Sequence, residues 1–398
     1  MELRPGRADD MEAIIELRRD CYPSSPGPEA LRQRYLCNPR FRLEDALWVG
    51  EVGGRVVASL LLIPFELYWP GGPQSMLGVA GVAVHPSYRR QGLAALLLRQ
   101  ALETRQANFS GLYPFRSAFY ARLGYAPIGR NQHWRLAPES LPRPSGWEPL
   151  QSANWEQLAQ LYHQAESAMG RGAALRNEAF WKQLLADSQL RVHAHPQGYL
   201  IYVHHPDRRQ PLTSRVEILE CLATHANAWP HLVGHLIGLQ KQVRHIDWPD
   251  AGDSSWPLNW AETVQPWGRE LRGENLTVGR ASVGLMLRFL DIPSAWQARR
   301  YEPQGHWQIN LEVRDPLARC QGSYRLNFNQ EQVVVESQPG KAELSCDVGS
   351  LTQLWCGAVT ARELLLWGQL QGPPEPWLRL GRACRSEFRP YIHPSDCF

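Results

Sequence analysis

Residues 82–94, VAVHPSYRRQGLA, carry the strongest structural signal in the chain. The alternating valines are typical of a strand, and the leucine spacing that follows Gly92 is helical. The free N–H groups at a helix start bind anions, with the helix dipole behind them. Gly92 would let a pyrophosphate approach the backbone, small Ala94 keeps the next turn clear, and Arg89 or Arg90 could add charge-assisted hydrogen bonds. The pattern predicts a phosphate-binding strand, loop and helix.

The residues around this stretch predict one α/β unit. Residues 46–50 and 56–62 bracket Gly53-Gly54 as a hairpin. The other expected elements are strands at 65–69, 76–84 and 109–113, a helix at about 117–123 and a last strand near 132–136. The sequence LPRPSG at 141–146 is interpreted as a linker.

The next segment repeats a similar order of elements. It has expected helices at 155–169, 177–187 and 229–240, and expected strands at 191–194, 199–204, 216–222 and 243–247. This echo suggests a duplicated fold. The loop ATHANAWP at 223–230 lacks the Arg-Arg-x-Gly arrangement, so the second copy is not expected to bind the phosphate.

The pattern changes again from about Leu285. HWQINLEV at 306–313 and GSYRLNFN at 322–329 alternate apolar and polar residues, as half-buried antiparallel strands do. SLTQLWCGAVTARELLLWGQL at 350–370 predicts helices, and two prolines prevent a regular helix in RPYIHPSDCF at 389–398. The predicted fold class is α/β (α+β), with domains at 1–143, 144–284 and 285–398.

Composition narrows the class of protein. A length of 398 residues suggests two or three domains, and 43% hydrophobic with 20% charged residues is ordinary for a soluble globular protein. The net charge of +3, from 42 basic and 39 acidic residues, argues against recognition of nucleic acid or a membrane surface by bulk charge. We find no signal peptide and no stretch of about 18 apolar residues. The eight scattered cysteines contain no CxxC pair, which favours a reduced, cytoplasmic protein.

Other motifs carry little chemistry. His231 and His235 have the helical spacing of zinc ligands, but no Glu follows the first His and no third ligand is apparent. No metal is therefore predicted. The chain also contains no GxSxG motif, no Walker loop and no dinucleotide GxGxxG.

The phosphate loop, together with Tyr120-Ala-Arg-Leu-Gly-Tyr125, resembles the GNAT N-acetyltransferase superfamily. That resemblance implies acetyl-CoA as co-substrate and Tyr120 as the acid that protonates the leaving thiolate. Taken alone, Tyr120 could equally be a core tyrosine. The backbone that would pair with the pantetheine arm is Val82, Ala83 and Val84. The residues that would hold the pyrophosphate are Arg89, Arg90, Gln91, Gly92, Leu93, Ala94 and Ala95.

A narrower resemblance covers the whole chain. GVAVHPSYRRQGL at 81–93, SAFYARLGYAPIG at 117–129, GLMLRFLDIPSAWQARRY at 284–301 and the final Phe398 are similar to the Eis (enhanced intracellular survival) acetyltransferases. The family implies an active GNAT domain, a degenerate GNAT domain and a sterol-carrier-like domain, assembled as a homo-hexamer. It further implies that the α-carboxylate of Phe398 acts as the general base, and that Phe115 and Arg116 contact acetyl-CoA.

The chemistry implied is direct attack of a primary amine on the thioester. An alkylamine is mostly protonated at neutral pH, so a nearby carboxylate is needed to draw off its proton. No acyl-enzyme is expected, because no Cys–His pair or nucleophilic Ser motif is apparent.

Two departures from the family bear on the acceptor. Cys397 stands where the aminoglycoside-modifying members have an acid, and the loop around Ser24-Ser25 has Glu29 as its nearest acidic residue. Both changes remove negative charge that would hold a polycation, which puts aminoglycosides in doubt but not amines in general. The alternatives are a lipid-binding protein that works through its third domain, and an acyltransferase that uses a longer acyl-CoA.

Overall fold

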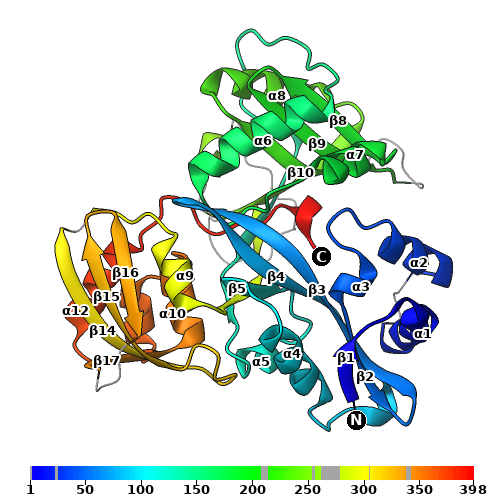
Figure 1. The fold of residues 1–398 in the computed structure, drawn as a ribbon. Coiled ribbons are helices and arrows are strands. Elements are labelled where there is room, and N and C mark those ends of the chain that lie inside the picture. Colours follow the sequence, from blue (N-terminus) through cyan, green and yellow to red (C-terminus); the bar gives the residue numbers. More distant parts are fainter. Residues whose placement is uncertain are drawn as a thin grey trace, which may run out of the picture.

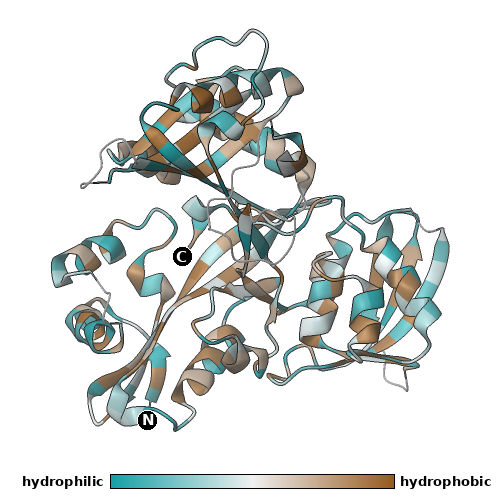
Figure 2. Cartoon of the chain, turned by 180° about the vertical axis from the view of Figure 1, so that it is seen from behind, coloured by the Kyte–Doolittle hydropathy of each residue, from teal (hydrophilic) through white to brown (hydrophobic). Residues whose placement is uncertain are grey.

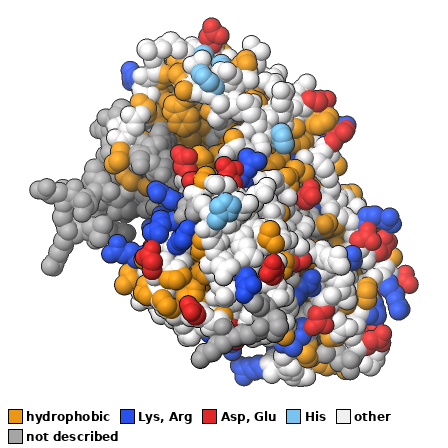
Figure 3. All heavy atoms as spheres, turned by 60° about the vertical axis from the view of Figure 1, so that its left-hand side comes forward, with side chains coloured by type: hydrophobic (Ala, Val, Ile, Leu, Met, Phe, Trp, Pro, Cys, Tyr) orange, Lys and Arg blue, Asp and Glu red, His pale blue; other side chains and the backbone are white. Residues whose placement is uncertain are grey.

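The computed structural model describes residues 2–22, 26–207, 214–252, 256–260, 278–303, 305–337 and 342–398. Within these ranges the chain forms three mixed sheets, each covered by helices (Figure 1). Hydrophobic residues concentrate on the strands and on the helix faces turned toward them (Figure 2). Basic and acidic side chains are interspersed over the face of the molecule shown in Figure 3. The predicted mixed α/β class is confirmed.

The first sheet has the strand order β1-β2-β3-β4-β5-β13-β6. Its strands are β1 (Glu2–Pro5), β2 (Leu47–Val52), β3 (Arg55–Trp69), β4 (Gly72–Val84), β5 (Phe109–Leu112), β6 (Ala126–Pro127) and β13 (Met286–Phe289). Its helices are α1 (Met11–Cys21), α2 (Pro28–Leu36), α3 (Leu43–Ala46), α4 (Leu93–Glu103) and α5 (Ser117–Ala121). The pair β4 and β5 is parallel, and the other pairs in this sheet are antiparallel.

The hairpin of β3 and β4 is longer than expected. The sequence predicted separate strands at 56–62 and 65–69, whereas β3 runs without a break through Pro64, which is exposed and paired with Leu77 in the register. The outer end of the hairpin extends beyond the rest of the first sheet (Figure 1). There the N–H of Tyr68 donates to the carbonyl of Ala173 at 2.9 Å, and the N–H of Arg300 donates to the carbonyl of Pro70 at 2.8 Å. The hairpin therefore joins all three parts of the chain.

The second sheet has the order β12-β7-β11-β10-β9-β8. Its strands are β7 (Arg130–Leu136), β8 (Leu190–His195), β9 (Gly198–His205), β10 (Ser214–Ala223), β11 (Val243–Asp250) and β12 (Gly279–Val283), and its helices are α6 (Trp155–Met169), α7 (Glu178–Ala186) and α8 (Trp229–Gly238). The predicted helices and strands of the second segment are confirmed. The loop before α8 contains a short 3-10 helix at Ala226–Ala228, where the His225 ring accepts the N–H of Asn227.

Two strands belong to sheets that the sequence did not predict. The strand expected to complete the first unit, near 132–136, lies in β7 and pairs with β11 and β12 of the second sheet. In exchange, β13, which the sequence placed in the third segment, pairs with β5 and β6 of the first sheet. Sheet membership therefore does not follow the expected divisions after 143 and 284. Neither pairing could be predicted from local pattern, because pairing across more than 100 residues leaves no trace in periodicity.

The third sheet has the order β16-β15-β14-β17-β18. Its strands are β14 (His306–Arg314), β15 (Gly322–Asn329), β16 (Gln332–Ser337), β17 (Leu344–Asp347) and β18 (Leu370–Gln371). Four helices accompany it: α9 (Ile292–Gln297), α10 (Val348–Trp355), α11 (Ala361–Leu366) and α12 (Pro374–Ala383). Trp296, Trp355 and Trp377 are fully buried in this part of the chain. The predicted alternation in 306–313 and 322–329 is confirmed.

Candidate active site

A cavity of about 360 Å³ lies beside the first sheet. Its walls come from α1, α2 and the end of β4, and residues 395–398 close it on another side. In Figure 1 these last residues lie between the first part of the chain and the second. Tyr120 and Phe398, two residues that the sequence singled out, both line this cavity although they are far apart in sequence.

The cavity opens where β4 and β5 stop pairing. Their parallel register covers only Met76–Gly78 against Phe109–Gly111, and β4 then runs on to Val84 without β5. A bulge interrupts the pairing of β4 with β3, and Gly81 in the bulge has φ of 58°, which favours glycine. Strand divergence and the bulge together leave residues 79–82 of β4 as part of the cavity wall, whereas Ala83 and Val84 lie beyond its lining.

The loop before α4 has the form that the sequence predicted. Helix α4 begins at Leu93, and Gly92 caps it with φ of 76°. A Cβ placed on Gly92 would meet no atom within 4 Å, so the space above the loop is open. Arg89, Arg90, Gln91 and Gly92 are exposed, whereas Leu93 is buried and anchors the helix. This is an open helix start of the kind that receives anions.

Two carbonyls of the β4 end already have side-chain donors. The Tyr22 hydroxyl donates to the carbonyl of Val82 at 2.6 Å. The carbonyl of Val84 accepts from the Cys21 thiol at 3.3 Å and from Arg89 Nε at 3.1 Å. The sequence analysis missed Tyr22 and Cys21, because nothing in the end of a helix indicates that it meets a strand 60 residues later.

Tyr120 is buried on α5 among aromatic rings. Its ring lies edge-on to those of Phe119 at 4.9 Å, Phe115 at 5.9 Å and Tyr125 at 6.0 Å between centroids. Burial, and then the neighbouring Tyr22 and Tyr125 hydroxyls, raise the pKa of Tyr120 above its ordinary value. The hydroxyl is protonated at neutral pH, as in any tyrosine, and the shift makes it a weaker acid than an exposed tyrosine.

The spacing from Tyr120 to Tyr125 has a structural reason. Gly124 has φ of 82°, and this turn brings the N–H of Tyr125 to the carbonyl of Tyr120 at 3.2 Å. A Cβ on Gly124 would also lie 2.7 Å from the Val348 side chain. The glycine therefore fixes both the turn and the contact with α10. Phe115 and Arg116, the remaining expected cofactor contacts, are exposed just before α5.

Phe398 packs into the first sheet. Its ring lies 4.7 Å from that of Phe65 and 5.5 Å from that of Tyr113. Gly78 makes room for it, since a Cβ there would lie 2.8 Å from the Phe398 ring. Cys397, beside it, is exposed and also lines the cavity. The loop around Ser24-Ser25, whose lack of acidic residues the sequence analysis noted, lies outside the described residues.

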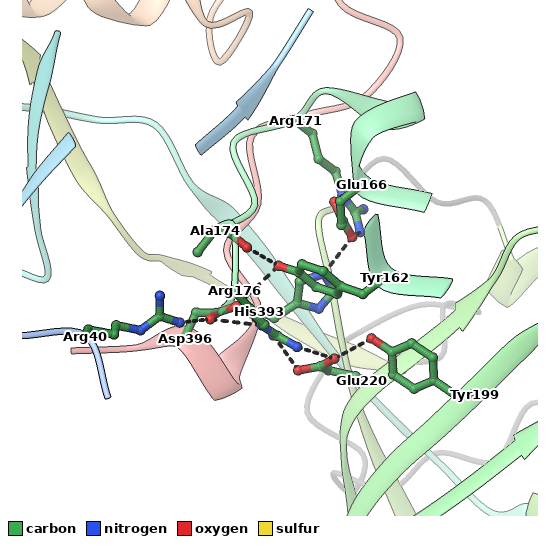
Figure 4. Close-up of polar contacts among 10 residues, drawn as sticks. All are labelled: Arg40, Tyr162, Glu166, Arg171, Ala174, Arg176, Tyr199, Glu220, His393 and Asp396. Carbon is green, nitrogen blue, oxygen red and sulfur yellow. Dashed lines mark hydrogen bonds and ion pairs between the residues drawn. The ribbon is translucent and has the colours of Figure 1, made fainter. Parts of the chain in front are cut away.

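A buried ion cluster holds residues 393–398 in place (Figure 4). The Asp396 carboxylate, whose side chain has no exposure to solvent, accepts from Arg40 and from Arg176, the latter at 2.6 Å. Arg176 also pairs with Glu220 at 2.6 Å, and Tyr199 donates to Glu220 at 2.7 Å. Two arginines thus face two carboxylates, so the cluster is neutral and its polar atoms are satisfied.

A second anchor lies a few residues earlier. His393 Nε2 lies 2.7 Å from the Glu166 carboxylate, which also pairs with Arg171 at 2.9 Å. Burial alone would raise the pKa of Glu166, but Arg171 and His393 lower it to about 2. The N–H of Tyr391 donates to the carbonyl of Arg171 at 2.9 Å. None of these anchoring residues was singled out from the sequence.

His231 and His235, which have the spacing of zinc ligands, make contacts with other residues of the second part of the chain. His231 Nδ1 accepts the N–H of Glu148 at 2.9 Å, and its ring stacks on that of His195. His235 Nε2 lies 3.1 Å from the Tyr202 hydroxyl. Among the residues described, no three His, Cys, Asp or Glu side chains are grouped so that they could hold a metal ion. Within the same residues, every helix is too short or too polar to cross a membrane.

Family models match three parts of the chain. They are an acetyltransferase (GNAT) domain over residues 2–128, a second acetyltransferase (GNAT) domain over 172–276, and a sterol carrier protein domain over 292–393. The first match contains the loop before α4 and the Tyr120 turn. The last match ends at His393, before the residues that enter the cavity.

Relatives resemble the chain along its length. N-acetyltransferase Eis of Mycobacterium tuberculosis is 26% identical over 355 residues, which are 82% of each protein. An uncharacterized N-acetyltransferase of Streptomyces griseus is 24% identical over 381 residues, 87% of each. Among solved structures, a GCN5-related N-acetyltransferase from Anabaena variabilis has a TM-score of 0.84 at 22% identity, and Eis1 from Mycobacterium abscessus has 0.79 at 19%; each comparison covers both chains in full. Two GNAT domains followed by a sterol carrier protein domain, with these relatives, show that the chain is an N-acetyltransferase of the GNAT superfamily that is similar to the Eis proteins over most of its length.

Proposed function

We propose that this protein transfers the acetyl group of acetyl-CoA to a primary amine by direct attack on the thioester. The observation that carries this proposal is that one cavity collects the end of β4, the Tyr120 hydroxyl and Phe398. Such a transfer needs a proton donor, a proton acceptor and a strand edge that binds the co-substrate.

The co-substrate site is proposed along the end of β4 and the start of α4. The open space over Gly92 fits a pyrophosphate, which the N–H groups of the loop would bind with help from Arg89 or Arg90. The pyrophosphate set is Arg89, Arg90, Gln91, Gly92, Leu93, Ala94 and Ala95. The pantetheine arm would lie along Val82–Val84, where it either uses the strand N–H groups or displaces the Tyr22 and Cys21 bonds to the carbonyls. Phe115 and Arg116 would flank it.

The proton steps follow from this placement. The α-carboxylate of Phe398 would take a proton from the ammonium form of the acceptor, which frees the nitrogen lone pair. The nitrogen then attacks the thioester carbon, and a backbone N–H near Val84 could stabilise the negative oxygen that develops. As the carbon–sulfur bond breaks, Tyr120 would give its proton to the thiolate. The attacking nitrogen would lose its second proton to the Tyr120 oxygen, directly or through water, and the Phe398 carboxyl would release its proton to solvent, so both groups return to their starting states. The products are an N-acetylated amine and free CoA.

The three segments would divide the work as the family does. We propose residues 1–143 as the catalytic unit, 144–284 as a degenerate copy that anchors residues 393–398, and 285–398 as the sterol-carrier-like unit. A homo-hexamer is proposed on the same resemblance, and a cytoplasmic location is proposed because the cysteines are scattered and form no CxxC pair. Light scattering on a size-exclusion column measures the assembly directly.

The lipid-binding alternative is not favoured. Trp296 and Trp377 are fully buried within the third part, together with many aliphatic side chains. Trp355 is also buried, but it packs against Trp69 and Phe109 of the first sheet. Indoles thus occupy interior volume that a lipid chain would need. Transfer of a longer acyl group remains an alternative for the first part, and comparison of acetyl-CoA with longer acyl-CoAs decides between them. A screen of primary amines with acetyl-CoA, followed by the release of free CoA, tests the function itself.

The loop gives a prediction about the co-substrate. Gly92→Val should lower acetyl-CoA affinity at least tenfold, about 1.4 kcal/mol, because a β-branched residue is strained at φ of 76° and its methyl groups would fill the open space. Isothermal calorimetry measures the affinity. Circular dichroism should show an unchanged fold, and an unchanged affinity would contradict this placement of the pyrophosphate.

Tyr120 gives a prediction about proton transfer. Tyr120→Phe removes one oxygen from a ring that is already packed among aromatics, and should lower turnover on the order of 10²-fold. Acetyl-CoA should bind to the variant as to the wild type. Tyr125→Phe is the matched control, because its hydroxyl lies 2.7 Å from Ser110 Oγ inside the core and not in the cavity. Wild-type turnover in Tyr120→Phe would return this residue to a purely structural role.

A further inference from the structure

The charged groups of the active-site cavity are mostly positive. Three arginines line it, Arg18, Arg34 and Arg40, and Asp396 is the one acidic side chain among the described residues of its lining. Asp396 is buried and already satisfied by Arg40 and Arg176. Its charge is therefore not available to a ligand, and Arg40 is neutralised by it. Phe398 also lines the cavity and adds the α-carboxylate of the chain, the proposed base. Among the described residues, neither Arg18 nor Arg34 forms an ion pair with Asp396 or with this carboxylate.

Arg18 projects from α1 toward the β4 bulge. Its guanidinium lies 4.9 Å from the Tyr22 ring centroid and 6.0 Å from that of Tyr35. A Cβ on Gly81 would lie 2.3 Å from Arg18 Nη1, so the absence of a side chain in the bulge makes room for this guanidinium. Arg18 Nε is buried without a hydrogen-bond partner in the described structure. Its surroundings are neutral tyrosines and backbone.

Arg32, a neighbouring arginine on α2, does have acidic partners. Arg32, two residues before Arg34 on α2, pairs with Glu12 at 2.7 Å and with Glu29 at 2.5 Å. By contrast, within the described residues no Asp or Glu oxygen lies within 4.0 Å of Arg18 or Arg34. A half-buried cation without a counter-ion raises the free energy of the protein, and a bound anion removes that electrostatic cost. A bound acceptor that carries further positive charges would increase the same cost.

We propose that the acetyl acceptor is a primary amine that also carries an anionic group, a carboxylate or a phosphate, and that Arg18 binds this anion, with Arg34 at the cavity mouth. The inference rests on the proposed function, because the amine is to be acetylated in the same cavity. The anion is held at the α1 side, and the amine end is left to reach toward Tyr120 and Phe398. A guanidinium suits this role, since its planar fork matches the oxygens of both anions.

The test uses acceptor pairs that share an amine and differ in the anion. They are 4-aminobutanoate against butylamine, and phosphoethanolamine against ethanolamine, each with saturating acetyl-CoA and a thiol assay for CoA. We expect kcat/KM to be at least tenfold higher for the anionic member of at least one pair, and to fall as salt is added. The pair that shows the preference tells a carboxylate from a phosphate. Equal values within both pairs would overturn the inference.

Arg18→Met should abolish this preference and leave acetyl-CoA affinity unchanged. Arg19→Met is the matched control, since Arg19 is the next residue of α1, is exposed and does not line the cavity. If Arg18→Met does not fold, Arg34→Met at the mouth should reduce the preference instead. A preference that survives in both Arg18→Met and Arg34→Met would contradict the assignment of these residues.

Binding of the acetylated products separates this inference from the proposed function. Calorimetry with N-acetyl-4-aminobutanoate, N-acetylphosphoethanolamine and N-butylacetamide needs no turnover. At least one anionic product should bind tenfold more tightly than the neutral one to the wild type, and no better to Arg18→Met. If no amine is acetylated, the proposed function fails while this measurement still decides on the anion. If amines are acetylated without preference and the products bind equally, only the anion inference fails.

Discussion

A tag fused after Phe398 is expected to lower turnover about 10³-fold while acetyl-CoA still binds. The tag converts the α-carboxylate into an amide, which cannot take the proton of the ammonium group. The tag would also have to extend out of the cavity from Phe398, whose ring is packed between Phe65 and Tyr113. The loop at 89–95 that is proposed to bind the pyrophosphate does not line this cavity, so affinity for the co-substrate should not change. The measurement is CoA release with an amine that the untagged enzyme accepts.

Two matched proteins complete this experiment. The same tag fused before Met1 should leave turnover unchanged, because β1 is an edge strand of the first sheet and β2 and β3 separate it from β4. Deletion of Phe398 keeps a carboxylate but moves it by up to about 3.5 Å, and should reduce turnover nearly as much as the tag. Equal turnover of the C-tagged and N-tagged proteins would show that Phe398 is not the base.

The sequence was most informative where chemistry and local geometry coincide. The loop before α4 could be predicted because a glycine with positive φ, a helix start and arginines must occur together in six residues. The Tyr120 turn could be predicted because Gly124 is needed at a fixed distance from the tyrosine. The helices and strands of the second part followed from periodicity alone.

The pairing of strands that are far apart in the chain could not be predicted from local sequence pattern. The exchange of β7 and β13 between sheets joins strands more than 100 residues from their partners, and each strand looks the same whichever sheet receives it. The sequence analysis divided β3 into two strands because Pro64 suggests a break. In the structure Pro64 is exposed, and the strand continues through it. Arg18 could not be identified either, since an arginine on an amphipathic helix ordinarily faces solvent.

The ion cluster around Asp396 shows the same limit. Arg40, Arg176, Glu220 and Asp396 come from four separate segments, and charged residues are expected at the surface when only the sequence is known. Asp396 lies two residues before Phe398, so the cluster sets where the proposed base can lie. If Phe398 is the base, a change at Arg176 should affect both stability and turnover, because Arg176 is paired with both carboxylates.

Arg176→Met is expected to lower the free energy of unfolding by about 3–5 kcal/mol. The substitution keeps much of the side-chain volume but leaves the buried Glu220 and Asp396 with only Arg40 as a counter-charge. Guanidinium unfolding followed by tryptophan fluorescence measures the change. Turnover should fall as well, because Asp396 loses one of its two partners and Phe398 its fixed position.

Arg32→Met provides the matched control. Arg32 also bridges two carboxylates, Glu12 and Glu29, but those side chains are about 70% exposed and water replaces the lost bonds. It should cost less than about 1 kcal/mol. The double variant Arg176→Met/Glu220→Gln should then be more stable than the sum of its single variants predicts, since it removes a buried negative charge together with its partner. Two outcomes would show that the cluster does not hold Asp396: additive effects of the two substitutions, or a stability cost for Arg176→Met as small as that of Arg32→Met. In that case the contacts of the Phe398 ring with Phe65 and Tyr113 are enough to place Phe398.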